Sequence, residues 1–461
     1  MISRYSIVPV CLLYLLCSGT QCYSQQPLPI RELIARVNSH APKLASDSAA
    51  IAIVQAREAA AKLNRLPSLK MNLQMNLGTN NNMPGGFFSN GIVPGNSRVR
   101  ESGNSGTALG DLGVIAFDWP VYNFGGYQSE LKVAHSDVAV ERARYVQNRY
   151  DLQAFVTEGY LQLIRLNQLL NIQSRNIERN SQIRRSIQAL AASGIIAGVD
   201  TSIAEAQLSK ARLEFLELTN QVKQVQISLS ALSGIDPDDI IPDSLLVDQL
   251  TEFYSQSGLQ ATDSITHPAV ELYRTIYRNS IDRESMVKKS YLPTVALQSA
   301  VWGRGSSISP ADEFRPLYTG FGFERGNYLV GIGITYNLFD EKRKRYELNT
   351  QRAFTAFTVK QIAEQQNLVE LNIRQSDAEL TIARDRLAEI PHQLEAAEAA
   401  YRQKFSLYRN GLTNIVELNA ALYMLYNAET DQINVGYGYW VAILKKIFNE
   451  NRLDEFFNRT N

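Results

Sequence analysis

The chain has 461 residues, with 46 lysines and arginines against 46 aspartates and glutamates, so its formal net charge at pH 7 is zero. This balance argues against a nucleic-acid-binding protein, which would carry an excess of basic residues. The length is sufficient for two or three ordinary domains.

The first 24 residues have the pattern of a secretory signal peptide. Arg4 precedes an apolar run from Val8 to Cys17, and small or polar residues follow as far as Ser24. We therefore expect the chain to be exported and cut after Ser24. All three cysteines, Cys11, Cys17 and Cys22, lie in this segment, so no disulfide or thiolate metal site is expected in the mature chain. Neither Cys17 nor Cys22 stands in a good lipidation motif, which disfavours a lipid anchor.

Residues 68–79 follow a strict two-residue alternation. The apolar positions are Leu69, Met71, Leu73, Met75 and Leu77, and the polar positions between them are Lys70, Asn72, Gln74 and Asn76. Because a strand has a side-chain period of two, one face would be wholly apolar and the other wholly polar. The apolar face would meet either the core of a soluble sheet or the lipid around a transmembrane barrel, whose strands need about 9–11 residues. Past the signal peptide no run approaches the roughly 18 apolar residues of a membrane helix, so any membrane-spanning part must consist of strands.

Four pairs of short motifs recur in the same order in the two halves of the chain. LNRLPSLKMNL at 63–73 is echoed by KSYLPTVALQS at 289–299, and the surroundings of His40 by those of His267. Tyr122-Asn123 corresponds to Tyr336-Asn337, and the spacing of Gly194 and Asp200 to that of Gly411 and Glu417. These ordered matches indicate an internal repeat, with residues 25–240 as the first copy and 241–461 as the second.

Each copy predicts two strands followed by a long helical hairpin. The strands are expected at 68–79 and 110–122 in the first copy and at 293–303 and 328–339 in the second. The hairpins are expected at 127–233 and 341–449, and at about 1.5 Å per residue each would be about 100 Å long. In the second hairpin, apolar residues alternate steps of three and four, as in a coiled coil, at Leu380, Ala383, Leu387, Ile390, Leu394, Ala397 and Tyr401. Long polar links join the strands at one end and tight connections lead into helices at the other, which is typical of an outer-membrane barrel.

Four strands are too few to close a transmembrane barrel, because the smallest barrels have about eight. An open sheet edge in lipid would leave backbone groups without hydrogen bonds, at a cost of several kcal/mol each. The chain is therefore expected to oligomerise. Two copies would give a barrel too narrow for an open lumen. Three copies would supply about twelve strands and a barrel with an open lumen.

Aromatic residues gather at the expected inner ends of the strands: Trp119, Tyr122, Phe124, Tyr291, Tyr336 and Phe339. An aromatic girdle at a membrane interface would explain them, and so would a soluble core. The run DEKRKR at 340–345 also has two possible interpretations. It is either the start of a helix with solvated cations or a surface that binds phosphates of the inner leaflet.

No pattern in the sequence predicts an enzyme. Metal-ligand spacings, a nucleophile elbow and a phosphate-binding loop are missing from the sequence, and the histidines, His40, His135, His267 and His392, are scattered. We therefore expect no catalytic residue, no cofactor and no metal site.

The duplicated strand pairs and hairpins, the motifs Leu66-Pro67 and Leu292-Pro293, the Tyr-Asn strand ends and the glycine-to-acid turns resemble the TolC family of outer-membrane efflux channels. The resemblance covers nearly the whole mature chain. It implies an α+β membrane protein in which each of three chains contributes four strands to a twelve-strand barrel. A long α-helical barrel would continue from it across the periplasm and meet an adaptor protein at its tip.

Carried over to this sequence, the resemblance places the periplasmic tip, its gate and the adaptor contact at five residues: Gly194, Asp200, Tyr408, Gly411 and Glu417. A further acidic ring of the family falls on Ala420, so the resemblance does not imply an acidic constriction there. The apolar residues of 68–79 would face lipid, and the aromatic residues would form the girdle.

The resemblance implies the outer-membrane exit duct of a tripartite efflux or type I secretion system, with a periplasmic adaptor and an inner-membrane transporter as partners. The alternative is a periplasmic coiled-coil adaptor, or a structural protein without a pore, but an adaptor would carry one hairpin set rather than two. The motifs do not separate drug efflux from protein secretion.

Overall fold

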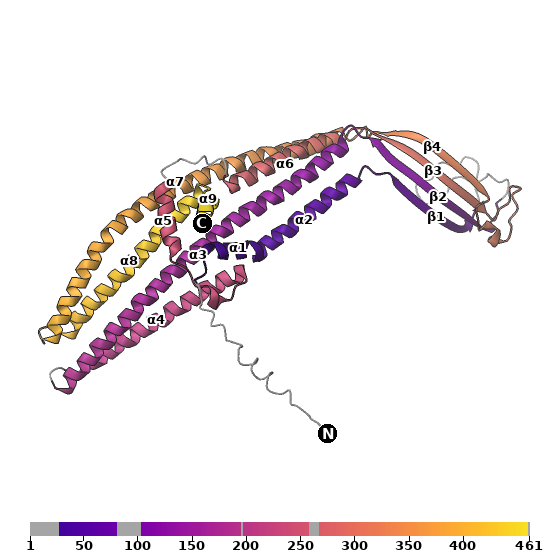
Figure 1. The fold of residues 1–461 in the computed structure, drawn as a ribbon. Coiled ribbons are helices and arrows are strands. Elements are labelled where there is room, and N and C mark those ends of the chain that lie inside the picture. Colours follow the sequence, from indigo (N-terminus) through magenta and orange to yellow (C-terminus); the bar gives the residue numbers. More distant parts are fainter. Residues whose placement is uncertain (1–26, 81–102, 195–196, 258–266, 460–461) are drawn as a thin grey trace, which may run out of the picture. The chain divides into compact units, whose positions relative to one another are not determined.

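The computed structural model describes residues 27–80, 103–194, 197–257 and 267–459 (Figure 1). The expected signal peptide and the three cysteines lie outside these residues. The elements are α1 (Ile30–His40), α2 (Pro42–Leu63), β1 (Ser68–Thr79), β2 (Thr107–Tyr122), α3 (Gly126–Ala192), α4 (Gly198–Ser233), η1 (Pro237–Asp239), α5 (Leu245–Ser257), α6 (Pro268–Ser290), β3 (Thr294–Ser306), η3 (Leu317–Gly320), β4 (Arg325–Thr335), α7 (Glu341–Arg409), α8 (Ile415–Asn449) and α9 (Leu453–Arg459), where η marks a 3-10 helix.

The chain divides into two compact units. Unit 1 contains Met1–Ala50, Arg142–Tyr273 and Ile362–Asn461, and unit 2 contains Ile51–Glu141 and Arg274–Gln361. The long helices α3 and α7, of 67 and 69 residues, each contribute segments to both units. Within the described part of the chain, no helix combines the length and the apolar character needed to cross a bilayer.

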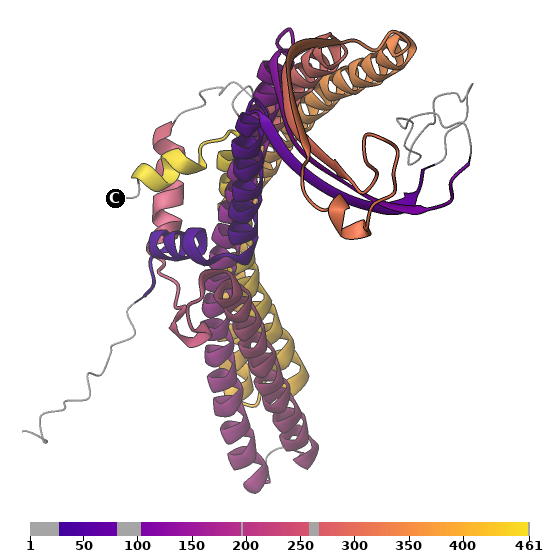
Figure 2. The ribbon, with the colours of Figure 1, turned by 90° about the vertical axis from the view of Figure 1, so that its right-hand side faces the viewer.

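Unit 2 contains a four-stranded antiparallel sheet with the strand order β1-β2-β3-β4, whose strands lie side by side in Figures 1 and 2. In one row across the sheet, Leu73 pairs with Gly113, Gly113 with Gly303, and Gly303 with Gly326. The first strand coincides with the range expected from the alternation. The next two strands differ from their expected ranges by no more than three residues at either end.

The fourth strand ends earlier than the sequence predicted. A strand was expected over 328–339, but β4 ends at Thr335. The last pair of its ladder is Thr294 with Thr335, and Pro293, which precedes β3, has no backbone N–H to donate to a further pair. Tyr336 and Phe339 therefore lie in the connection to α7 and not on the strand.

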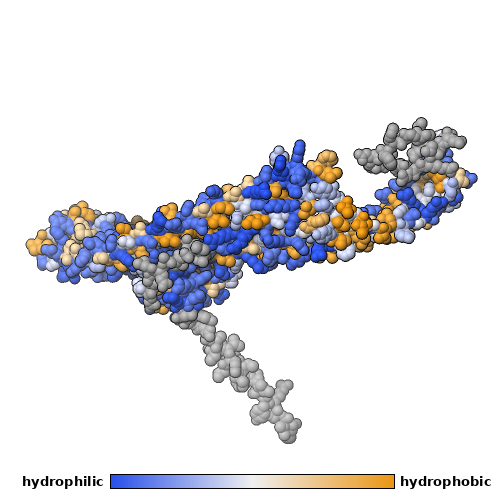
Figure 3. Space-filling model, turned by 90° about the horizontal axis from the view of Figure 1, so that it is seen from above, coloured by the Kyte–Doolittle hydropathy of each residue, from blue (hydrophilic) through white to orange (hydrophobic). Residues whose placement is uncertain are grey.

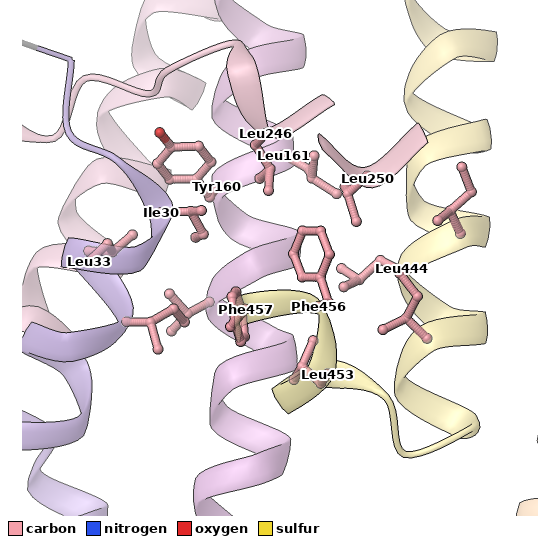
Figure 4. Packing of buried hydrophobic residues seen from close by; sticks show 14 of the residues in the cluster. Ile30, Leu33, Tyr160, Leu161, Leu246, Leu250, Leu444, Leu453, Phe456 and Phe457 are labelled. Atoms are coloured by element: carbon pink, nitrogen blue, oxygen red, sulfur yellow. The ribbon is translucent and has the colours of Figure 1, made fainter. Parts of the chain in front are cut away.

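The main core of unit 1 joins segments that are far apart in the sequence (Figure 4). Phe456 of the C-terminal helix α9 and Leu161 of α3 are both fully buried in it. The hydroxyl of Tyr160 donates a hydrogen bond of 2.6 Å to the carbonyl oxygen of Leu28 and accepts one of 2.5 Å from the backbone N–H of Asp243. The middle of α3 thus holds the segment before α1, the segment before α5, and α9.

The apolar stripe of α7 is buried at most of the expected positions. Leu380, Ala383, Ile390 and Ala397 are all less than 10% exposed, which confirms the prediction of a packed helical seam. Leu387 is 38% exposed, so the prediction is wrong at this position.

Candidate functional site

The sheet of unit 2 carries one continuous apolar face. The register places Met71, Ile115, Val301 and Tyr328 in one row across all four strands. Their side chains are exposed, by 77% for Met71 and 80% for Tyr328. This apolar face consists of the exposed residues Leu69, Met71, Leu73, Met75 and Leu77 of β1, Ile115, Trp119 and Val121 of β2, Val301 of β3, and Tyr328, Val330, Ile332 and Ile334 of β4. Exposed apolar patches of this extent mark a surface that binds lipid or another protein.

The opposite face of the sheet is polar along β1 and mixed on the other strands, where Val114, Trp302 and Leu329 also lie on it. It carries Lys70, Asn72, Gln74 and Asn76 on β1, and the amide of Gln298 on β3 donates a hydrogen bond of 3.0 Å to the carboxylate of Asp118 on β2. The outermost strands, β1 and β4, each have one neighbour in the sheet. One edge of each therefore presents its backbone N–H and C=O groups to whatever surrounds the chain.

Five of the six aromatic residues expected at the inner strand ends are exposed, and the sixth, Tyr291, is half-buried, so the five are not part of a core within this chain. The exposed fraction runs from 38% for Trp119 to 96% for Phe339. The indole of Trp119 donates a hydrogen bond of 3.0 Å to the carbonyl oxygen of Arg65. The rings of Tyr122 and Phe124 meet edge to face with centroids 4.7 Å apart. Figure 3 shows hydrophobic residues gathered where the strands meet the helices.

The predicted tip glycines lie in the two helix-to-helix turns of unit 1. Gly194 has a φ of 73° and Gly411 a φ of 71°. A Cβ atom at either position would meet no other atom within 4 Å, so it is the left-handed backbone, and not a close approach, that favours glycine.

A small hydrophobic cluster joins the two hairpins near their turns and contains one of the predicted residues, Tyr408. This tip cluster consists of Ile183, Ile187, Ala204, Tyr408, Ile415, Leu418 and Leu422. Tyr408 is only 5% exposed, and its hydroxyl is buried without a hydrogen-bond partner among the residues that the structure describes. Burial raises the pKa of Tyr408 above its usual value, and the negative charge of Asp200 raises it further.

Glu417 is held by contacts within its own hairpin. Its carboxylate accepts hydrogen bonds of 2.6 Å from Nζ of Lys404 and 2.8 Å from the hydroxyl of Thr413. The bond from Lys404 is the main reason that the pKa of Glu417 lies below its usual value, and the bond from Thr413 adds to it. Both predicted acids stand in the first turn of a returning helix, Asp200 in α4 and Glu417 in α8.

Three groups of the hairpins were not predicted from the sequence, two of them beside the second turn and one farther along the helices. The side chain of Asn414 caps α8 by accepting a hydrogen bond of 2.9 Å from the backbone N–H of Glu417, and the Asn-x-x-Glu spacing is a signal that could have revealed it. Lys404, the partner of Glu417, follows no such pattern. The guanidinium of Arg179 on α3 donates two hydrogen bonds, of 2.9 and 2.5 Å, to the carboxylate of Glu429 on α8.

An open groove of about 220 Å³ lies beside the tip cluster. Its lining is mainly apolar and comes from the end of α3, the end of α7 and the start of α8: Ile183, Ser186, Ala189, Leu190, Phe405, Tyr408, Arg409 and Leu418. Tyr408 thus belongs both to the cluster and to the wall of the groove. In the described ranges, no group of three or more histidine, cysteine, aspartate or glutamate side chains is arranged to hold a metal ion.

Comparison with known proteins identifies one family. The family model described as "Outer membrane efflux protein" matches residues 33–235 and 256–442, one block in each expected copy of the repeat. No curated protein sequence matches the chain.

Solved structures share the fold. VceC of Vibrio cholerae is 16% identical, with a TM-score of 0.69 over 91% of this chain and 95% of that one. CmeC of Campylobacter jejuni is 12% identical, with a TM-score of 0.72 over 94% and 88%. MtrE of Neisseria gonorrhoeae, described in an open state, is 13% identical, with a TM-score of 0.66 over 91% and 88%.

The left-handed glycines yield a prediction about the turns. Replacing Gly411 with alanine should destabilise the turn by about 1 kcal/mol. A Cβ disfavours the left-handed backbone conformation by about 1–2 kcal/mol. Part of this cost is offset because alanine lowers the conformational entropy of the unfolded chain. Hydrogen exchange of the amides at 410–414 should accelerate correspondingly. Gly198→Ala is the matched control, since Gly198 opens α4 without a positive φ and with no atom near its would-be Cβ. Equal effects of the two substitutions would contradict the conformational explanation.

Proposed function

The chain belongs to the outer membrane efflux protein family, and from this premise we propose that it is the outer-membrane exit duct of a tripartite efflux or type I secretion system. It moves small molecules or proteins from the periplasm or from an inner-membrane transporter to the outside. The observation that carries the proposal is the apolar face that runs across all four strands of a sheet with two free edges.

The free edges favour a closed ring of several chains. In lipid, the backbone groups on the outer sides of β1 and β4 must be hydrogen-bonded, because each unpaired group costs several kcal/mol. Neighbouring strands in the sheet are antiparallel, so β1 and β4 run in opposite directions. The fourth strand of one chain can therefore pair antiparallel with the first strand of the next, and their lengths of 11 and 12 residues match. Three chains close about twelve strands around an open lumen.

The two faces of the sheet suit this barrel. The apolar face turns outward to the hydrocarbon, and the polar face, with Lys70, Asn72, Gln74 and Asn76, turns toward a wet lumen. The aromatic residues at the inner strand ends, from Trp119 to Phe339, then form the girdle at the periplasmic interface. The paired hairpins α3–α4 and α7–α8 form the periplasmic part of the duct.

The tip groove is the proposed contact for a periplasmic adaptor. It is mainly apolar, it is open, and it lies next to both turns, where Gly194 and Gly411 end the outgoing helices. An adaptor bound there would link the duct to an inner-membrane transporter. The side chains of Arg409 and Ser186 give the groove polar groups that can orient such a partner.

The same residues are proposed to hold the tip closed at rest. The hydroxyl of Tyr408 is buried and has no partner in the described part of the chain, so a neighbouring chain of the trimer can supply one. Asp200, whose charge acts on Tyr408, belongs to the other hairpin and can move with it. A partner opens such a tip only by binding the open form more tightly than the closed one.

The mass of the assembly tests the proposal directly. Light scattering of detergent-extracted protein, with the detergent subtracted, should give the mass of three chains, or about 150 kDa from a chain mass of 51.7 kDa that includes the leader. The extract should also form conducting pores in planar bilayers. A stable, detergent-free monomer in water would exclude a barrel of this kind.

A charge on the apolar face should be far more costly than one on the polar face. Leu69→Arg places the charge on the apolar face, in the same row across the sheet as Val330, and should destabilise the folded barrel by about 2–4 kcal/mol. Asn72→Arg, three residues along β1 on the polar face, should cost much less. The measurement is the denaturant midpoint of folding into lipid vesicles. Equal costs at the two positions would show that the assignment of the two faces is wrong.

The gate is tested by the double variant Tyr408→Phe and Glu417→Ala. It removes the hydroxyl available to a neighbouring chain and frees Lys404 from its partner, so single-channel conductance should rise while the trimer still assembles. Glu395→Ala, which changes an exposed carboxylate elsewhere on α7, is the control and should conduct like the parent. If the double variant also conducts like the parent, the turn residues serve as caps and partner contacts and the gate lies elsewhere.

A further inference from the structure

The connection between β3 and β4 has a defined structure of its own. The backbone N–H of Ser307 donates to the carbonyl oxygen of Leu109 at 2.9 Å, and the hydroxyl of Ser307 accepts from the N–H of Leu109 at 2.9 Å. Further along, the N–H of Arg315 bonds to the carbonyl oxygen of Ser307 at 2.8 Å, and that of Glu324 to the oxygen of Arg304 at 2.9 Å. The 3-10 helix η3 lies between these bonds. The connection is thus tied to the central strands at both of its ends.

This connection lies on the apolar side of the sheet. The register pairs Gly113 with Leu73, and Gly303 with Gly113. Residues paired in this way share one face of the sheet, so a side chain at either glycine would point to the apolar face. A Cβ on Gly113 would come within 2.4 Å of the ring of Phe323, and one on Gly303 within 2.7 Å. The ring of Phe323 therefore fills a notch that the two glycines leave in the apolar face.

A second contact holds the connection on this side. The N–H of Gly322 donates a hydrogen bond of 2.9 Å to the carboxylate of Asp111, which lies two residues before Gly113 on the same face of β2. The other carboxylate oxygen of Asp111 is buried and has no hydrogen-bond partner within the described ranges. A carboxylate on the lipid side of a strand is tolerated near a membrane interface and disfavoured at the middle of the bilayer. The position of Asp111 therefore indicates that a membrane interface lies at its height along the strands.

The connection presents large apolar side chains to its surroundings. Tyr318 is 71% exposed, Phe321 58%, Phe323 57% and Leu317 42%. The η3 helix contacts β2 and β3, the two central strands of the sheet. A neighbouring chain that pairs with an edge strand would lie beyond β1 or β4, so strand pairing leaves these aromatic residues uncovered.

The notch lies at a distinct height along the strands. Gly303 is nine residues from the inner end of β3 at Thr294, and Gly113 is nine residues from the inner end of β2 at Tyr122. At about 3.3 Å per residue and a strand tilt of about 40°, nine residues rise about 23 Å along the membrane normal. The apolar band of an outer-membrane barrel is about 25 Å tall. Phe323 thus sits at the outer limit of that band, opposite the inner aromatic residues.

We propose that residues 317–323 form an outer aromatic belt, in which Tyr318, Phe321 and Phe323 insert into the headgroup region of the outer leaflet. This inference rests on the proposed function, because it assumes that the apolar face meets lipid. The glycine notch and the bond from Gly322 to Asp111 set the depth of the belt. The partner is the lipid surface itself, not another protein.

Tryptophan emission in vesicles with brominated acyl chains tests the proposal. The natural tryptophans, Trp119, Trp302 and Trp440, are replaced with phenylalanine, and a single tryptophan is placed at Tyr318. Its emission should be quenched, and more by bromine near the headgroups than by bromine at the chain ends. Val330→Trp on the apolar face should be quenched by the deep bromine, and Asn327→Trp on the polar face by neither.

The outcomes separate the two proposals. Quenching at 330 without quenching at 318 overturns the belt and leaves the barrel intact. No quenching at 330 overturns the lipid-facing sheet, and the belt with it. Stronger quenching at 318 by the deep bromine than by the shallow one overturns the assigned depth.

A matched pair of glycine variants tests the notch. Gly303→Ala would push against Cγ and Cβ of Phe323, close to the backbone, and should lower the bromolipid quenching of the tryptophan at 318. Gly326→Ala is the control, because Gly326 pairs with Gly303 and a Cβ there would meet no atom within 4 Å. An equal response to the two variants, in trimers that still assemble, would show that the notch does not position the belt.

Discussion

The free edges of a four-stranded sheet are the constraint on which the rest of this molecule depends. The backbone groups along the outer sides of β1 and β4 have no neighbour within the sheet, and the sheet presents a continuous apolar face, from Leu69 to Ile334. Exposing that apolar face to water is unfavourable, and placing the open edges in lipid leaves backbone groups without hydrogen bonds. Only closure with other copies satisfies both demands. The proposed oligomer, the proposed outward direction of the apolar face and the proposed lumen are all derived from this pair of requirements.

The helical turns differ from the strand edges, because their polar side chains find hydrogen-bond partners within the same chain. Asn414 caps α8, and Glu417 bonds to Lys404 and Thr413, so these groups need no partner from outside. Tyr408 differs from these residues. Its buried hydroxyl has no partner among the described residues, and leaving such a group unpaired costs about 1–3 kcal/mol. A group of this kind is suited to a contact that forms in one state of an assembly and breaks in another.

Glycine has two different roles in the two units. In the turns, Gly194 and Gly411 supply a left-handed backbone with open space around it. In the sheet, Gly113 and Gly303 supply room for the ring of Phe323 and let a connecting segment lie against the strands. The first role concerns the conformation of a single backbone position, and the second concerns how closely a connecting segment can approach the strands.

The sequence by itself determined the local features that have a period or a short motif. The alternation of 68–79 predicted β1 to the residue, the glycine-to-acid spacings located both turns, and the motif pairs revealed the repeat, because each depends only on neighbouring residues. Contacts between distant residues were decided by the tertiary structure. The pairing of Thr294 with Thr335 ended β4 before Phe339, the packing of two hairpins buried Tyr408 beside Asp200, and the return of the chain over β2 and β3 placed Phe323 in the notch. None of these has a local signal, since each joins residues that come together only when the chain is folded.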